Sequence, residues 1–201
     1  MLKNLDPLLN ADILHALSSM GHGDELVICD ANFQGDSVAR QSVLGKVLRM
    51  DGVSASRAVR AVLSVLPLDT FIDHPASRME VVGEPDTIPA VQREAQAEVN
   101  AGEGRDMPFA SIERFAFYER ARKAYCVIAT GEERGYGYFI FTKGVFSRRT
   151  RRNPDRARSE RSRRGERVRA NRAKFLPSGK RNAQRATRHT RVVTLLTVTN
   201  P

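Results

Sequence analysis

Cysteine is scarce in this sequence, and long apolar runs are missing from it. The two cysteines, Cys29 and Cys126, lie in short apolar stretches, so we expect small buried side chains rather than a disulfide framework. The longest apolar run, AVLSVLPL at residues 61–68, is far shorter than the roughly 20 residues that a membrane helix needs. The first ten residues contain no continuous apolar stretch typical of a signal peptide. These absences predict a soluble, cytoplasmic protein.

The usual motifs for metals and nucleotides are missing too. The histidines His15, His22, His74 and His189 have no spacing to acids or cysteines typical of a metal site. No Walker-type phosphate loop occurs. The glycines of GHG at residues 21–23 follow a predicted helix and precede a predicted strand, which is the reverse of the order in a dinucleotide-binding motif. We therefore expect neither a metal nor an organic cofactor.

The positive charge of the chain is confined to its last segment. The formal net charge is +10, yet residues 1–145 carry 20 acidic and 15 basic side chains, whereas residues 146–201 carry 3 and 18. The basic segment is nearly free of apolar residues over thirty positions, which predicts a disordered tail. It arises either from a frameshift or altered stop codon near Val145, or as an arm that binds nucleic acid through phosphates. The sequence thus predicts one domain, 1–145, and a separate tail, 146–201.

Helix and strand patterns alternate through the first 145 residues. Helices are predicted at 10–20 after a capping Asn10, at 54–66 after a capping Ser54, at 87–104 after Asp86 or Thr87, and at 115–125. Strands are predicted at 25–29, 78–83, 125–130 and 138–143, while residues 42–52 fit either a short strand or a short helix. This alternation predicts a single-domain α/β fold, an α/β/α sandwich around a central sheet.

Two polar residues flank the first predicted strand. His22 lies between Gly21 and Gly23, and histidine is suited to proton transfer near neutral pH. Asp30 comes directly after the strand, where ligands bind in many α/β proteins. The alternative for His22 is an ordinary turn residue without a role in chemistry.

Aromatic and basic residues gather later in the sequence. Arg114 precedes the helical FAFYER and could bind hydroxyl groups or form an ion pair. Tyr136 and Tyr138 flank Gly137, and side chains two residues apart on a strand point to one face. Phenol rings suit sugars or aromatic ligands, and a half-exposed strand edge is the alternative.

Several segments together resemble a known family. They are LKNLDPLLNADILHALSSMGHGDELVICDANF, AVLSVLPLD, IERFAFYERARKAY and IATGEERGYGYFIFTKGV. In this order they resemble the bacterial L-fucose mutarotase family, which is related to the D-ribose pyranases. The resemblance extends over residues 1–145 and ends where the basic tail begins.

The resemblance implies an isomerase that interconverts the α and β anomers of a free pyranose, with L-fucose the expected monosaccharide. It implies an α/β fold assembled as a decamer, with pockets at subunit contacts and no need for a metal or a covalent intermediate. A pyranase acting on ribose or another sugar, and a sugar-binding accessory of a transport system without catalysis, are the alternatives.

The resemblance also implies roles for single residues. His22 is the expected proton donor and acceptor, and the other expected site residues hold the sugar: Asp30, Arg114, Tyr118, Tyr136, Gly137 and Tyr138. Tyr138 stands where many relatives have asparagine, so the amide contact to the sugar is lost there. If residues 23–30 are extended, His22 and Asp30 lie about 25 Å apart. They share a pocket only if the turn folds back or if they come from neighbouring subunits.

Overall fold

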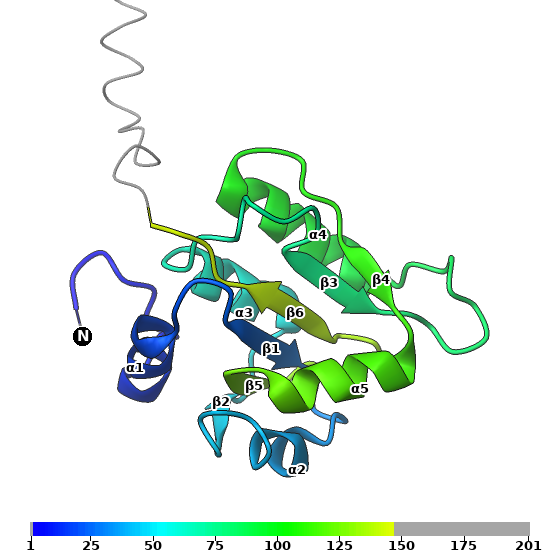
Figure 1. Cartoon of the computed structure of the whole chain (residues 1–201), viewed down its shortest axis with the longest axis horizontal. Helices are drawn as coiled ribbons and strands as arrows, with labels where there is room; N and C mark the ends of the chain where they lie inside the picture. The colour runs from blue at the N-terminus through cyan, green and yellow to red at the C-terminus, as the bar shows by residue number, and fades with distance from the viewer. Residues whose placement is uncertain (1, 147–201) are drawn as a thin grey trace, which may run out of the picture. The chain divides into compact units, whose positions relative to one another are not determined.

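The computed structural model describes residues 2–146, in which five helices and six strands alternate (Figure 1). In chain order they are α1 (Ala11–Ser19), β1 (Glu25–Cys29), α2 (Gly35–Ala39), β2 (Val47–Met50), α3 (Ala55–Leu63), β3 (Ala76–Met79), α4 (Ala90–Glu103), β4 (Ala110–Ile112), α5 (Arg114–Lys123), β5 (Cys126–Thr130) and β6 (Phe139–Thr142). The predicted α/β class is confirmed. Within residues 2–146 no helix is both long and apolar enough to cross a membrane. The prediction of a disordered tail falls on residues outside the described part of the chain.

The strands of residues 2–146 form one mixed sheet in the order β2-β5-β1-β6-β3-β4. β1 pairs with β5 in parallel, β5 with β2, and β3 with β4. β6 runs antiparallel to both of its neighbours, β1 and β3. The last strand of residues 2–146 therefore lies inside the sheet and joins two groups of parallel strands.

Side chains that alternate along the strands fill a core on each face of the sheet. On β1, Leu26 and Ile28 pack with α1, α3 and α4, whereas Val27 and Cys29 pack with α2 and α5. Figure 1 shows α2 and α5 together on one side of the sheet. The α/β/α sandwich is thus confirmed. Cys29 and Cys126 are both buried and unpaired, as the sequence predicts.

Local side-chain caps fix the beginnings of two helices. The side chain of Asn10 accepts the Ile13 N–H at 3.0 Å, and Ser54 accepts the Arg57 N–H at 3.3 Å. These bonds satisfy backbone donors that have no partner inside the helix. Both caps were predicted.

Several boundaries differ from the prediction. The strand expected at 78–83 is β3 (Ala76–Met79), because Val81 forms only an isolated bridge with Glu84 and Val82 is exposed. Helix α4 begins after Pro89 rather than after Asp86 or Thr87. The ambiguous stretch 42–52 contains strand β2. The short α2 and β4 were not predicted.

Candidate functional site

Asp30 follows β1 directly and is a buried carboxylate with one unpartnered oxygen. Only 1% of the residue is exposed. Its Oδ1 accepts the Asn32 N–H at 2.9 Å, whereas Oδ2 has no hydrogen-bond partner among residues 2–146. Burial raises the pKa of this carboxyl group, and the Asn32 N–H partly opposes the rise. A buried acceptor without a donor is costly and is suited to a ligand hydroxyl.

An aromatic cluster lies beside this carboxylate, and its members are Phe33, Phe117, Tyr118, Tyr136 and Tyr138. Phe33 is central, because its ring stacks on Tyr118 at 5.3 Å and lies 5.2 Å from Tyr138 between centroids. Burial, and then the nearby charge of Asp30, raise the pKa of the Tyr138 phenol. The phenol is therefore a neutral proton donor over the physiological range.

Gly137 allows the loop between β5 and β6 to pack closely against Asp30. A Cβ atom at position 137 would lie 3.3 Å from the Asp30 Cβ and 3.4 Å from the Val91 Cγ2. The preceding Tyr136 has a left-handed backbone with φ of 65°, and its carbonyl accepts the Gln92 Nε2–H at 3.0 Å. Two of the predicted site residues, Tyr136 and Gly137, are thus held in a loop that packs against Asp30, and Tyr138 follows them directly.

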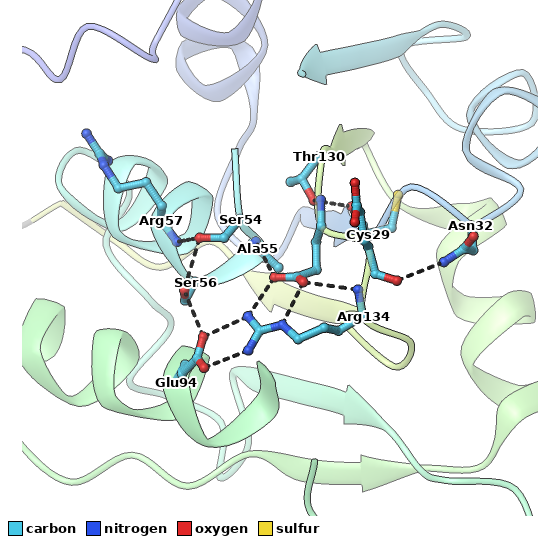
Figure 2. A network of polar contacts seen from close by, with 11 residues as sticks. Cys29, Asn32, Ser54, Ala55, Ser56, Arg57, Glu94, Thr130 and Arg134 are labelled. Atoms are coloured by element: carbon cyan, nitrogen blue, oxygen red, sulfur yellow. Dashed lines mark hydrogen bonds and ion pairs between the residues drawn. The ribbon is translucent and has the colours of Figure 1, made fainter. Parts of the chain in front are cut away.

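A polar network supports the other end of the same loop (Figure 2). Glu132 is buried, accepts the Ala55 N–H at the start of α3 and pairs with Arg134 at 2.8 Å. Arg134 also pairs with Glu94 of α4 at 2.7 Å. Arg134 is the main cause of the lowered pKa of Glu132, about 2. The Glu132 carbonyl accepts the Ala31 N–H at 2.9 Å, so the network connects directly to the residue after Asp30.

Arg114 is the first residue of α5 and lies at the edge of the aromatic cluster. Its guanidinium carbon is 6.0 Å from the Tyr118 ring centroid. Both side chains line an open cleft of about 220 Å³, together with Gln34, Phe115, Glu119 and Arg122. Arg114 is exposed, so its guanidinium is accessible to a ligand in that cleft.

His22 lies elsewhere, on the turn before β1. Its Nε2 is 3.0 Å from Oδ2 of Asp69, and its ring meets the Phe71 ring edge-on at 5.6 Å. The imidazole is 48% exposed, while the Asp69 side chain is 4% exposed. The other oxygen of Asp69 accepts the Phe71 N–H at 2.9 Å. A fixed, buried carboxylate thus orients an exposed imidazole.

Asp69 was not among the predicted site residues. The two residues are 47 positions apart in the sequence, so local patterns do not pair them. They meet because both of their segments bind the end of β6 and the residue that follows it: Asp69 donates its N–H to the Thr142 carbonyl at 3.0 Å, and Gly23 donates its N–H to the Lys143 carbonyl at 2.8 Å. The only sequence signal was the occurrence of this aspartate at the end of AVLSVLPLD, one of the segments that carry the resemblance.

A single copy of the chain does not bring all predicted site residues together. Asp30, Tyr118, Tyr136, Gly137 and Tyr138 lie beyond the carboxyl end of β1, with Arg114 at the margin. His22 precedes the amino end of the same strand. A strand of five residues is about 17 Å long, so the turn does not fold back to Asp30. Among residues 2–146 no group of three or more acids, histidines or cysteines is placed to hold a metal ion.

Comparison with known proteins gives consistent matches. The sequence matches the RbsD / FucU transport protein family over residues 3–146. It is 41% identical to the fucose mutarotase of Homo sapiens, over 73% of this chain and 95% of the human protein. It is 37% identical to the L-fucose mutarotase of Histophilus somni, over 72% of this chain and 97% of that protein.

Solved structures agree with these matches. The fucose mutarotase of Streptococcus pneumoniae in complex with L-fucose is 34% identical, with a TM-score of 0.65 over 73% of this chain and all of that chain. RbsD of Bacillus subtilis, complexed with D-ribose, is 19% identical with a TM-score of 0.53 and shares the fold alone.

Proposed function

The chain belongs to the RbsD / FucU transport protein family, and from this premise we propose that it is an L-fucose mutarotase, an isomerase of free sugars. The single observation that carries the chemistry is the contact between His22 and Asp69. Anomer exchange requires a group that both accepts and donates a proton near neutral pH, and an accessible imidazole held by a carboxylate meets this requirement.

The reaction opens and recloses the pyranose ring. A base removes the proton of the anomeric hydroxyl while an acid protonates the ring oxygen, so the bond between C1 and the ring oxygen breaks and an aldehyde forms. Rotation about the C1–C2 bond and the reverse proton transfers give the other anomer. Because Asp69 accepts a hydrogen bond from Nε2–H of His22, the lone pair of Nδ1 remains free to exchange the proton.

The sugar-holding half of the site is assigned by the same proposal to the residues around Asp30. The unpartnered Oδ2 of Asp30 accepts a sugar hydroxyl, and the exposed guanidinium of Arg114 binds another. Tyr118, Tyr136 and Tyr138 provide flat walls for the apolar face of the ring, and Gly137 keeps the loop close. Positioning of this kind lowers the barrier by restricting the bound geometry.

The two halves meet, in this proposal, at contacts between subunits. Phe71 beside His22 is 74% exposed, and Phe115 beside Arg114 is 72% exposed. Exposed apolar side chains indicate an interaction surface where they lie next to one another, and Ile72, which follows Phe71, is exposed as well. We infer a homo-oligomer, a decamer by the resemblance, in which His22 of one subunit faces Asp30 of its neighbour. A cytoplasmic location is part of the same proposal.

Saturation-transfer NMR on the anomeric protons of L-fucose and D-ribose tests the activity. We expect exchange with L-fucose, a loss of about 10²-fold or more in His22→Ala, and a loss of about tenfold or more in Asp69→Asn. His15→Ala is the matched control, because His15 is an exposed residue of α1. Faster exchange of ribose would favour a pyranase, and line broadening without exchange would favour a sugar-binding accessory. Full exchange in His22→Ala would contradict the role of this residue.

Mixed oligomers test the shared site. His22→Ala and Asp30→Asn subunits are each expected to be inactive, but when they assemble together about a quarter of randomly formed contacts pair an intact His22 with an intact Asp30. Recovered exchange in the mixture would support the shared site. Separately assembled oligomers mixed without dissociation are the control, and inactivity of co-assembled oligomers would contradict it.

A further inference from the structure

A second cleft lies between β3, α4 and the segment before β4, away from the proposed sugar site. Its volume is about 270 Å³, and its lining residues are Arg78, Ile88, Gln92, Arg93, Gln96, Pro108 and Phe109. None of the residues proposed above for mutarotation lines it. The proposed reaction therefore gives this cleft no role.

Arg78 is a buried cation in this cleft that lacks an ionic partner. Only 7% of the residue is exposed. Its Nη1 donates to the Gln92 Oε1 at 3.0 Å and its Nη2 to the Pro85 carbonyl at 3.4 Å, and both acceptors are neutral. No carboxylate of residues 2–146 lies within 4.0 Å of the guanidinium, although the less buried Arg120 and Arg57 each pair with one.

An uncompensated charge in a buried position is unfavourable, and an anion that binds there removes this cost. The planar guanidinium matches the two oxygens of a carboxylate. A second cation, the exposed Arg93, lies at the rim of the cleft and adds to the positive potential. The observed charge therefore favours an anionic ligand rather than a neutral sugar.

The walls restrict the rest of the ligand. Ile88, Pro108 and Phe109 are apolar, and Gln96 is held by its own contacts to the Met107 carbonyl and the Phe109 N–H. We propose that this cleft binds a small organic carboxylate with a compact aromatic or branched body. The carboxylate contacts Arg78 and the body packs against the apolar walls.

The Gln92 side chain lies between the cleft and the loop that joins β5 to β6, and it forms hydrogen bonds on both sides. Besides accepting from Arg78, this fully buried amide donates to the Met79 carbonyl at 2.8 Å and to the Tyr136 carbonyl at 3.0 Å. Gln92 thus separates the cleft from the aromatic cluster, so the anion site and the sugar site are two distinct places.

Methyl NMR of the full chain with ¹³C-labelled isoleucine δ1 groups tests the proposal with benzoate as the probe. We expect benzoate to shift the Ile88 methyl signal saturably, and an Ile88→Val variant identifies that signal. The methyl group of Ile13, buried in α1, should not move. Benzyl alcohol, which has the same ring without the charge, and inorganic phosphate, which has charge without an apolar body, should each bind about tenfold or more weakly.

Substitutions test whether benzoate binds through the Arg78 guanidinium or is attracted nonspecifically by the positive charges of the protein. Arg78→Met should weaken benzoate binding about tenfold or more, and Arg78→Lys, which keeps the charge but loses the planar fork, should be intermediate. Arg49→Met is the matched control, because Arg49 is an exposed arginine of β2 paired with Asp51. If Arg78→Met does not fold, the comparison of benzoate with benzyl alcohol on the natural chain shows whether binding requires the negative charge of the ligand. Equal shifts by these two compounds, no saturable Ile88 shift at millimolar benzoate, or unchanged binding by a folded Arg78→Met would overturn the proposal.

Discussion

At the scale of single residues, Asp30 shows how a group proposed for ligand binding can reduce the stability of the fold that holds it. Its carboxylate is removed from water, and one oxygen has no partner within residues 2–146. Burial of this kind disfavours the charged form, in agreement with the raised pKa. A buried hydrogen-bond acceptor that has no donor in the native fold is explained if a ligand supplies that donor.

Asp30→Asn should therefore change stability and activity in opposite directions. At neutral pH we expect the free energy of unfolding to rise by about 1–2 kcal/mol, because a neutral amide replaces an unpaired charge, while anomer exchange is lost. In the natural chain the carboxyl group is protonated in both the folded and the unfolded state at strongly acidic pH. The gain in stability should thus disappear in acid and grow as the pH rises through the raised pKa. Urea unfolding at several pH values measures it, and a loss of stability at pH 7 would contradict it.

The residues of the site differ in how far a sequence can predict them. His22 and Asp30 were noticeable from local patterns, because one lies between glycines and the other ends an apolar strand. Local patterns suggested a ligand contact for Arg114 and for Tyr136 and Tyr138, but they left an ion pair or a strand edge as alternatives. Tyr118 and Gly137 gained roles only through the resemblance. Asp69 was missed because its contact with His22 depends on pairing with the distant end of β6.

At the scale of elements, the loop between β5 and β6 positions three of the proposed sugar contacts. Glu132 attaches this loop to α3 and Arg134 attaches it to α4, so two helices fix its path. The pKa of Glu132, about 2, lies below the ordinary value of 4.5, mainly because of Arg134. A lowered carboxyl pKa means that the folded state gains stability when this group is ionised.

Glu132→Gln should destabilise the chain by about 2 kcal/mol above pH 5, since it breaks an ion pair whose carboxylate is buried and leaves the half-exposed Arg134 with one carboxylate. The difference from the natural chain should shrink as the pH falls from 4.5 toward 2, where the native carboxylate becomes protonated. Glu94→Gln removes the more exposed partner of the same arginine and should cost under about 1 kcal/mol. Equal losses in both variants at pH 7, measured by thermal unfolding, would contradict a special role of Glu132.

Elements with local signals were the ones that the sequence located well. The helices after Asn10 and Ser54 begin where a side chain caps the backbone next to it. β4 (Ala110–Ile112) was missed because a three-residue edge strand carries no pattern of its own and exists through pairing with β3. β3 begins two residues earlier than predicted, at Ala76, since the pairing with β6 rather than the apolar Val81 and Val82 sets its bounds.

At the scale of the whole molecule, the charge is divided between two parts of the chain. Residues 1–145 have a formal net charge of −5 and residues 146–201 one of +15. Every residue that the proposed reaction uses precedes position 139. We therefore propose that the basic segment is separate from catalysis, whether it arose by a frameshift or serves as a nucleic-acid arm.

A chain that ends at Phe146 should keep its rate of anomer exchange within about twofold, because the removed residues contribute no proposed contact. Saturation-transfer NMR on both chains measures this, and a much larger loss would show that the segment takes part. Filter binding of RNA and DNA to both chains, at two salt concentrations, tests whether the basic segment binds nucleic acid. Retention by the full chain that weakens with salt would support it, whereas equal, negligible retention by both chains would exclude it.

The interior position of β6 has a consequence for synthesis on the ribosome. Until Phe139–Thr142 has emerged, β1 and β3 have no partner on the sides that face each other, and unpaired strand edges invite association with other chains. The strand groups on the two sides of β6 therefore stay unjoined in the nascent protein until nearly all of the domain has been synthesised. A nonsense codon shortly before this strand would therefore do more than shorten the protein. The product would lack the strand that joins β1 to β3 and could not form the complete sheet.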